Sequence, residues 1–335
     1  MPTHSKFFAL ALIGLAALIP YLDWTGDRRS GPLLSDLRTL PIQSQGKPGT
    51  AGNLLGIEAR LLPADYQDAQ RLQLRFATYL DQAHKEGLLN ERTLVVLPEH
   101  VGTGLFAVDE KPEVQQARTL RDAMQWMALS NPWGYLRALL DHQGRDRRTE
   151  AVLKIKADQM ARDYQAVFGG LAKTYGVTLV AGSIVLPEPR LTDGRLVAGS
   201  GPLRQVSLTF SRDGMPLGPL QYKEQLSRYE RRYSEAPADA QNTLIQTPAG
   251  RLAVRIGCDG DRRALEADAE LLVITGAGKA LPPPCSNDQA ATPDVPTLRV
   301  STFELPWNLV GSPRRPTRHP RGEPVRITNL WLPEP

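Results

Sequence analysis

The sequence has few of the residues that mark several large classes of protein. Its 335 residues include two cysteines, Cys258 and Cys285, too few for a disulfide scaffold. The five histidines (positions 4, 84, 100, 142 and 319) do not have the spacing of metal ligands. RNP, KH, zinc-finger and G-x-S-x-G motifs are absent. The missing motifs and a net charge of only +4 predict no nucleic-acid partner, and the scattered histidines predict no metal site.

The two cysteines leave two interpretations open. If the domain is exported to an oxidising compartment, Cys258 and Cys285 can form a disulfide, and both residues are then structural. If they stay reduced, either thiol is available for chemistry. Composition alone does not separate the two.

A targeting segment is predicted at the N-terminus. Lys6 precedes an apolar run over residues 7–22, which fits the core of a signal peptide, or an anchor if residues 21–24 extend it. No A-x-A cleavage site follows this run. We therefore favour an uncleaved signal anchor over residues 1–24, with the body of the protein exported. A cleaved signal peptide and a buried N-terminal helix are the alternatives.

The rest of the chain alternates between strand-like and helix-like patterns. Residues 25–52 are rich in Gly, Pro, Ser and Gln and are expected to form a linker to a domain at 53–335. Residues 110–160 form a charged helical insert, and the chain is Pro-rich after residue 280. The alternation predicts an α/β layered domain. Strands are predicted at 54–59, 93–98, 177–186, 206–210, 252–256, 271–274, 298–305 and 325–332, and helices at 65–85, 161–175 and 262–269.

Three strand ends carry residues suited to a thiol hydrolase. Glu99 follows Leu97-Pro98, Lys223 follows Tyr222, and Cys258 follows Ile256-Gly257. Each signal is weak alone, because a strand-end carboxylate is usually solvated and a buried cysteine is usually a small apolar residue. Their order at strand ends of one α/β domain favours a common site.

These segments resemble the three motifs of the nitrilase superfamily of carbon–nitrogen hydrolases, over about residues 53–280. The resemblance implies an α-β-β-α sandwich, a possible homodimer, and hydrolysis of a small-molecule amide or nitrile through a Cys thioester. It makes Cys258 the nucleophile, Glu99 the general base and Lys223 the oxyanion stabiliser. A second glutamate is expected after the lysine, and Glu230 is the candidate, with Glu224 and Glu235 as competitors.

The chemistry is consistent with these residue types. A thiol at neutral pH is mostly protonated, so it needs a base or a nearby cation. The backbone N–H of Asp259 is expected to assist Lys223 at the oxyanion, and no cofactor is required. Asp259 and Gly260 depart from the family pattern after the cysteine, where an acidic residue is expected two positions on.

Two other functions remain possible. An N-acyltransferase would use the same three residues but pass the acyl group to an amine, and a non-catalytic relative would use the fold as a binding module. Two surface segments are also open to interpretation. The aromatic stretch at 126–140 could form a lid, a membrane-interface patch or an ordinary packed helix. The basic stretch at 314–321 could touch anionic lipid or form a solvated loop.

Overall fold

Two β-sheets form the centre of the protein in a computed structural model. The structure describes all residues except 1–2, 29–33, 141–144, 239–242, 260–264, 277–293, 302, 304, 310, 317–322 and 335. The first sheet has seven strands, in the spatial order β1 (Gln43–Gln45), β13 (Val325–Trp331), β2 (Asn53–Ala59), β3 (Thr93–Val96), β4 (Thr178–Pro187), β7 (Leu203–Phe210) and β8 (Gln221–Tyr222). The second sheet has four, in the order β12 (Thr297–Ser301), β11 (Leu271–Gly276), β10 (Gly250–Ile256) and β9 (Ile245–Thr247).

Parallel strands lie in the middle of both sheets. The neighbours β2, β3 and β4 are parallel, as are β10, β11 and β12. A short antiparallel hairpin, β5 (Arg190–Thr192) and β6 (Arg195–Val197), stands apart from the two sheets. Because parallel strands of one sheet all end at the same edge, the segments that follow β3 and β10 are free to carry functional side chains there.

The two sheets pack face to face through apolar side chains. Leu94 and Val96 of β3 belong to the core between the sheets, together with Val254 of β10 and Val273 of β11. Gly56 of β2 makes this approach possible, since a Cβ there would lie 2.7 Å from Val300 Cγ2. Alternate residues of the same strands, such as Val95, face the opposite side. A strand buried on both faces explains the continuous apolar run in the sequence.

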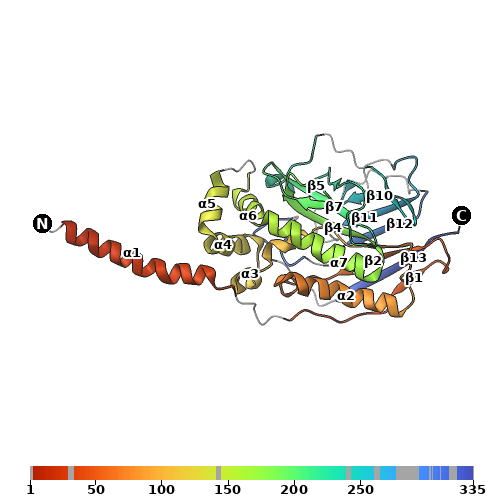
Figure 1. Cartoon of the computed structure of the whole chain (residues 1–335), viewed down its shortest axis with the longest axis horizontal. Helices are drawn as coiled ribbons and strands as arrows, with labels where there is room; N and C mark the ends of the chain where they lie inside the picture. The colour runs from red at the N-terminus through yellow and green to blue at the C-terminus, as the bar shows by residue number, and fades with distance from the viewer. Residues whose placement is uncertain are drawn as a thin grey trace.

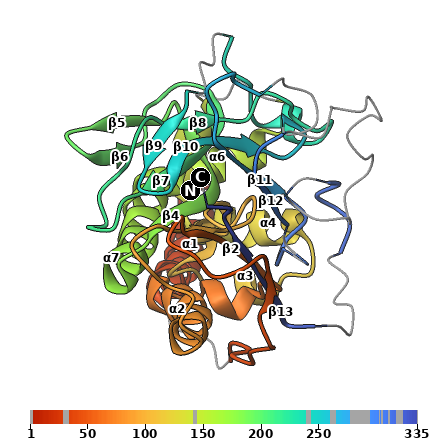
Figure 2. The ribbon, with the colours of Figure 1, turned by 90° about the vertical axis from the view of Figure 1, so that its right-hand side faces the viewer.

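Helices cover the outer face of the first sheet, as Figures 1 and 2 show for α2 and α7. Asp68 caps α2 (Ala69–Lys85) by accepting a hydrogen bond from the Arg71 N–H at 2.8 Å. The helix α6 (Arg147–Tyr164) continues through a π-helical turn (Gln165–Gly169) into α7 (Gly170–Tyr175). Phe76 of α2 packs against Phe168 of the π-helical turn at a ring distance of 6.1 Å, which joins the helices into one layer.

The predicted α/β fold is confirmed, with three of the four expected layers formed by described residues. A helix was expected at 262–269, but 265–269 are not helical, and 260–264 lie outside the described residues. Residues 43–45, placed in the predicted linker, form the edge strand β1 beside β13. The β-propensity of these polar residues does not predict a strand, because they become a strand only by pairing with β13.

The predicted insert at 110–160 is helical. It contains α3 (Pro112–Gln116), α4 (Leu120–Ser130), α5 (Pro132–Leu140) and most of α6. In α4, Met124 and Met127 are buried, as expected for a packed helix. None of the α5 residues is buried, and its Trp133 is 76% exposed. The aromatic stretch therefore divides into one packed helix and one exposed helix.

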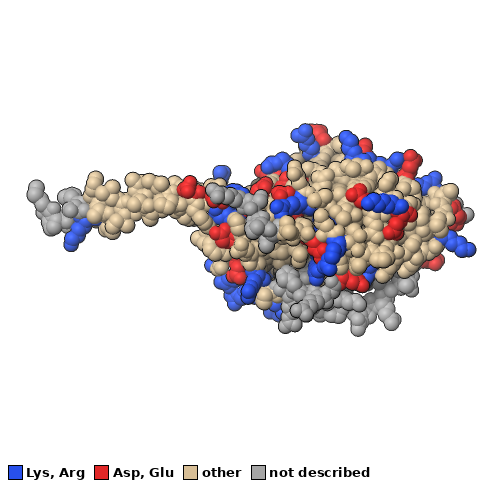
Figure 3. Space-filling view, turned by 90° about the horizontal axis from the view of Figure 1, so that it is seen from below, with Lys and Arg blue, Asp and Glu red and all other residues tan. Residues whose placement is uncertain are grey.

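The N-terminal helix α1 (Thr3–Gly26) projects from the body of the protein (Figure 1). Its apolar stretch, Lys6–Gly26, has 21 residues with no buried part, so the buried-helix alternative is wrong. Such a helix is about 32 Å long, enough to serve as a membrane anchor or signal sequence. In Figure 3 most of this helix shows no charged residue on the visible face.

The C-terminal end of α1 is fixed against the helical insert. The Tyr21 hydroxyl donates a 2.7 Å hydrogen bond to the Leu129 carbonyl, and Trp24 lies 6.4 Å from Trp126 between ring centroids. Lys111 donates to the carbonyl of Trp24 and lies over its ring. These contacts place α4 beside the point where α1 leaves the body.

Candidate active site

Glu99 lies just beyond the end of β3, where the two sheets meet. Its backbone N–H donates a 3.1 Å hydrogen bond to the carbonyl of Gly276, the last residue of β11 in the other sheet. The preceding peptide is fitted closely against a bulge in β4 at Gly182, which has a φ of +70°. A Cβ on Gly182 would lie 2.0 Å from the Pro98 carbonyl oxygen. Glycine is therefore required beside Glu99 both for space and for backbone conformation.

Lys223 follows the two-residue edge strand β8 and points into the site. Its backbone N–H donates to the Gln205 carbonyl of β7 at 2.9 Å, which fixes the start of the following loop. The ammonium lies 2.5 Å from Glu99 Oε1 and 2.7 Å from Glu230 Oε1. All three side chains are at most 4% exposed. The lysine thus joins the two glutamates that the sequence analysis selected.

The charges of this cluster depend on one another. Burial alone would lower the pKa of Lys223, but the Glu230 and Glu99 carboxylates raise it well above its usual value. Burial alone would raise the pKa of Glu230, but the Lys223 ammonium and the His100 ring hold it far below its usual value. Lys223 is therefore a permanent cation and Glu230 a permanent anion at neutral pH.

Glu230 begins a short 3-10 turn (Glu230–Arg232) and has no exposed surface. Its Oε2 also accepts a 2.6 Å hydrogen bond from the Ser227 N–H. Of its predicted competitors, Glu235 lies at the surface beside Arg204, and the Glu224 N–H donates to Asp259. The structure thus brings Glu230, rather than the other two side chains, to the lysine.

His100 is a site residue that the sequence analysis missed. Its Nε2 lies 3.0 Å from Glu230 Oε1, and its Nδ1 lies 3.1 Å from the Thr103 hydroxyl. Since the Glu230 carboxylate can only accept, Nε2 carries the proton of that bond. His100 has a φ of +60°, a conformation that is uncommon for a residue other than glycine. Its place directly after Glu99 was the one available signal.

Gln205 of β7 is the second residue that was missed. Its amide donates to Glu99 Oε1 at 2.7 Å and to the Ser183 hydroxyl at 2.9 Å. Glu99 therefore accepts hydrogen bonds from an amide and from an ammonium, which fix its orientation. The one signal in the sequence was its place directly before the strand predicted at 206–210, where a buried amide needs partners.

Cys258 follows the end of β10, next to this cluster. The preceding residue, Gly257, has a φ of +58° and donates a 2.7 Å hydrogen bond to the Thr275 carbonyl. A Cβ at Gly257 would lie 3.2 Å from Lys223 Nζ and 3.3 Å from Glu99 Oε2. The chain thus passes beside the lysine and the glutamate one residue before the cysteine.

Cys258 is disulfide-bonded in the structure. The sequence has one other cysteine, Cys285, which lies outside the described residues. A sulfur in a disulfide is not a thiolate and cannot attack a carbonyl group. Any nucleophilic role therefore belongs to the reduced form of the chain.

Asp259 has a structural role that the sequence did not reveal. Its buried carboxylate accepts hydrogen bonds from the backbone N–H groups of Glu224 at 2.8 Å and Gln225 at 2.7 Å. Burial raises the pKa of Asp259 to about 6, and the two backbone hydrogen bonds oppose that rise. The side chain therefore ties the turn after β10 to the loop after Lys223.

Glu99, His100 and Glu230 have ligand atoms within 4.8 Å of one another, a spacing that could hold a metal ion. However, Lys223 Nζ already lies within hydrogen-bond distance of both carboxylates. A divalent cation at the same place would be repelled by this ammonium. The arrangement favours an ammonium-centred site over a metal site.

Comparison with known proteins gives structural neighbours only. No family model matches the sequence, and no curated protein matches it. A carbon–nitrogen hydrolase from Helicobacter pylori is similar at 18% identity and a TM-score of 0.41, over 68% of this chain and 60% of that chain. An amidase from Nesterenkonia is similar at 15% identity and a TM-score of 0.43, over 70% of this chain and 68% of that chain.

Nit3 from Saccharomyces cerevisiae, a member of branch 10 of the nitrilase superfamily, is similar at 17% identity and a TM-score of 0.37. The alignment covers 68% of this chain and 65% of Nit3. These similarities concern the fold, and the reaction has to be inferred from the residues of this chain.

Proposed function

We propose that the reduced chain is a thiol-dependent hydrolase of non-peptide carbon–nitrogen bonds in a small amide or nitrile. The observation that carries this proposal is the buried contact of Lys223 with Glu99 and Glu230, next to the turn that leads to Cys258. A buried lysine held between two glutamates is costly to desolvate, so a purely structural role is a weak explanation. Beside a cysteine, the same three groups supply a base and an oxyanion partner.

The proposed reaction has two halves. Glu99 takes the proton of the Cys258 thiol, and the sulfur attacks the amide carbon to form a tetrahedral intermediate. Lys223 and the Asp259 backbone N–H stabilise its oxyanion. Glu99 then gives the proton to the leaving nitrogen as the C–N bond breaks, which leaves a thioester.

In the second half, Glu99 takes a proton from water, and the hydroxide attacks the thioester carbon. The C–S bond breaks, the acid leaves, and the proton returns to the sulfur. Glu230 and His100 hold Lys223 in place throughout, and Gln205 orients Glu99. These steps require no metal or organic cofactor.

The first test is the reactivity of the cysteines. The reduced full-length chain is treated with iodoacetamide at neutral pH, and alkylation of Cys258 is compared with that of Cys285 by mass spectrometry. We expect Cys258 to react faster and Glu99→Gln to remove the difference, because the glutamate is the base that accepts the proton of the thiol. If Cys258 reacts no faster than Cys285 in the reduced chain, it is not an activated nucleophile.

An N-acyltransferase would use the same residues and pass the acyl group to an amine. Hydroxylamine added during turnover of an amide separates the two reactions. A hydrolase releases mainly the carboxylic acid when water alone is present and a hydroxamate in proportion to added hydroxylamine. A transferase gives little acid without an amine acceptor and depends on the acceptor for turnover.

The disulfide at Cys258 favours a second candidate, a non-catalytic binding module. In that case the Lys223 cluster stabilises the fold, and the disulfide is permanent. Retention of the disulfide in freshly purified protein, with no amide turnover after reduction, would support this candidate. Turnover that appears on reduction and disappears in Cys258→Ser would exclude it.

We also propose that α1 anchors the domain to a membrane and that the domain is exported. The exposed apolar helix supports an anchor or a signal sequence, and a disulfide is typical of an oxidising compartment. Extraction of membranes with alkaline carbonate tests the anchor, since an integral protein stays in the pellet. Accessibility of the domain to protease from outside the cytoplasmic membrane tests the export.

A further inference from the structure

A pocket of about 620 Å³ lies beside the proposed active site and carries a concentrated positive charge. The described residues that line it include seven arginines and one carboxylate, that of Asp146. The 3-10 turn that presents Glu230 to Lys223 presents Arg232 to this pocket. The pocket and the ion cluster are thus built on the same short turn.

The arginines come from four segments that backbone hydrogen bonds join in two pairs. Arg121 of α4 donates its backbone N–H to the Pro313 carbonyl at 2.9 Å, next to Arg314. The Asp146 N–H at the start of α6 donates to the Arg232 carbonyl at 2.8 Å. Within each pair, a backbone hydrogen bond therefore fixes the position of the arginines relative to one another.

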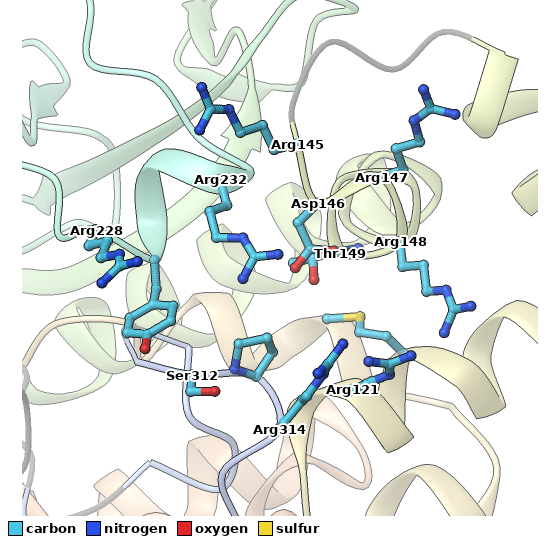
Figure 4. Close-up of a pocket in the computed structure, with 13 residues that line it drawn as sticks. Arg121, Arg145, Asp146, Arg147, Arg148, Thr149, Arg228, Arg232, Ser312 and Arg314 are labelled. Atoms are coloured by element: carbon cyan, nitrogen blue, oxygen red, sulfur yellow. Dashed lines mark hydrogen bonds between the residues drawn. The ribbon is translucent and has the colours of Figure 1, made fainter.

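The side chains converge in part. In Figure 4, Arg232 and Arg314 point toward the middle of the pocket from different sides, whereas Arg145 and Arg147 point outward. Asp146 is already engaged, since its carboxylate caps α6 by accepting from the Thr149 N–H. Within the described part of the chain, no ion pair within 4.0 Å neutralises any of the seven guanidinium groups. Such a cluster repels itself and attracts an anion.

We infer that this pocket binds a phosphate group. A phosphate presents several acceptor oxygens in a tetrahedral arrangement and up to two negative charges, so guanidinium groups can approach it from several sides. A carboxylate has two oxygens in one plane and one charge, and would leave most of the arginines without a partner. The inference goes beyond the proposed hydrolysis and does not depend on it.

The position of the pocket allows two sources for the phosphate. Arg121 and Met124 of α4 line the pocket, and Trp126 and Leu129 of the same helix meet the end of α1. Since a helix is about 10 Å across, the pocket lies close to the point where α1 would enter a membrane. The phosphate can therefore belong to an anionic lipid headgroup or to a free phosphorylated molecule.

The test is calorimetric titration of the full-length chain in uncharged detergent with pyrophosphate, at ionic strength held constant with chloride. We expect saturable binding, weakened about tenfold for each arginine removed in Arg232→Ala, Arg314→Ala and the double variant. The double variant Arg232→Lys, Arg314→Lys keeps both charges but loses the paired N–H donors of the guanidinium groups. Its affinity for pyrophosphate should lie between that of the wild type and that of the double alanine variant. Arg195→Ala is the matched control, because Arg195 is exposed on β6, away from the pocket.

Absence of saturable binding in the wild type, or equal affinity in the Arg232→Ala, Arg314→Ala double variant, would overturn the inference. Binding of a duplex oligonucleotide that pyrophosphate fails to displace would also overturn it. A comparison of two lipid bilayers then shows whether the phosphate belongs to a lipid headgroup or to a free molecule. If nanodiscs containing phosphatidylglycerol weaken pyrophosphate binding relative to phosphatidylcholine alone, the lipid headgroup occupies the site. Equal affinity in both supports the site for a free phosphorylated molecule.

Discussion

Lys223 Nζ lies 2.5 Å from Glu99 Oε1, although the two residues are 124 positions apart in the chain. The pair is completed by Glu230, so one ammonium is shared by two buried carboxylates. Two negative charges and one positive charge in a buried site are stable only because His100 and Gln205 donate further hydrogen bonds to the two carboxylates. The cluster is therefore sensitive to the loss of any single member.

Removal of the lysine charge should destabilise the protein strongly. Lys223→Met leaves two buried carboxylates without a cation, and we expect a loss of about 3–5 kcal/mol in urea unfolding. The double variant Lys223→Met, Glu230→Gln should be less destabilised than Lys223→Met alone, because one unpaired charge is gone. Arg212→Met breaks the exposed Arg212–Glu91 pair and is the control, with an expected loss below about 1 kcal/mol.

A comparable loss in Lys223→Met and Arg212→Met would show that the cluster is not buried in solution as it is in the structure. The activity of Lys223→Met is not informative by itself, since the lysine is also the proposed oxyanion partner. The stability measurement is therefore the primary readout.

Activity should depend on the redox state of Cys258. We expect the wild type to turn over amides only after reduction, because the disulfide consumes the nucleophile. Cys285→Ser removes the one possible partner within the chain and should make the enzyme active without reductant. Cys258→Ser should be inactive under both conditions while retaining its fold by circular dichroism. Activity of the oxidised wild type equal to that of Cys285→Ser would show that Cys258 is not the nucleophile.

The bulge at Gly182 should be essential for the position of Glu99. Gly182→Ala places a methyl group 2.0 Å from the Pro98 carbonyl oxygen and also strains a φ of +70°. We therefore expect the free energy of unfolding to fall by about 2–4 kcal/mol and turnover to be lost. Gly176→Ala is the matched control, with a φ of +62° and open space around its Cβ. It should lose only about 1 kcal/mol in thermal unfolding and keep its activity. Equal effects of the two substitutions would mean that backbone strain alone matters at Gly182.

The stability of the protein should depend on pH through Asp259. The folded state raises the pKa of this carboxyl to about 6 from an ordinary value of 3.8, so the folded state holds the proton more tightly. The resulting stabilisation is complete below about pH 4 and is lost as the pH rises through 6. It amounts to about 3 kcal/mol.

Asp259→Asn removes this titration and keeps one oxygen to accept from the backbone N–H groups. Urea unfolding of both proteins between pH 4 and pH 7 measures the effect. The stability of the wild type relative to Asp259→Asn should decline over this range. A constant difference across the range would show that the pKa of Asp259 is not raised.

Loss of His100 should remove a hydrogen bond that positions Glu230, while the proposed nucleophile, Cys258, stays intact. His100→Phe removes the donor to Glu230 Oε1, and we expect kcat to fall about tenfold or more with little change in KM, because the lysine is no longer fixed. His100→Asn is the better-tolerated variant, since asparagine adopts a positive φ more readily. A change confined to KM would place His100 in substrate binding instead of positioning.

The sequence by itself predicted the layers and most of the strands. Continuous apolar runs such as residues 93–98 mark strands buried on both faces, and these form β3 and its neighbours. The choice of Glu99 and Lys223 as neighbours came from their place at strand ends, because topology limits where such ends can meet. Glu230 was chosen because the resemblance to the nitrilase superfamily implies a second glutamate after the lysine. The catalytic roles of these residues and of Cys258 remain predictions.

The tertiary structure alone decided the partners of these residues and the charged surfaces around them. The hydrogen-bond partners of His100, Gln205 and the Asp259 side chain became visible only in the folded chain, since local sequence pattern does not specify a partner that is distant in sequence. The same holds for the arginine pocket, whose residues come from four separate segments. Local periodicity records which face of an element is buried. Which group that buried face contacts is decided by the packing of elements that lie far apart in the sequence.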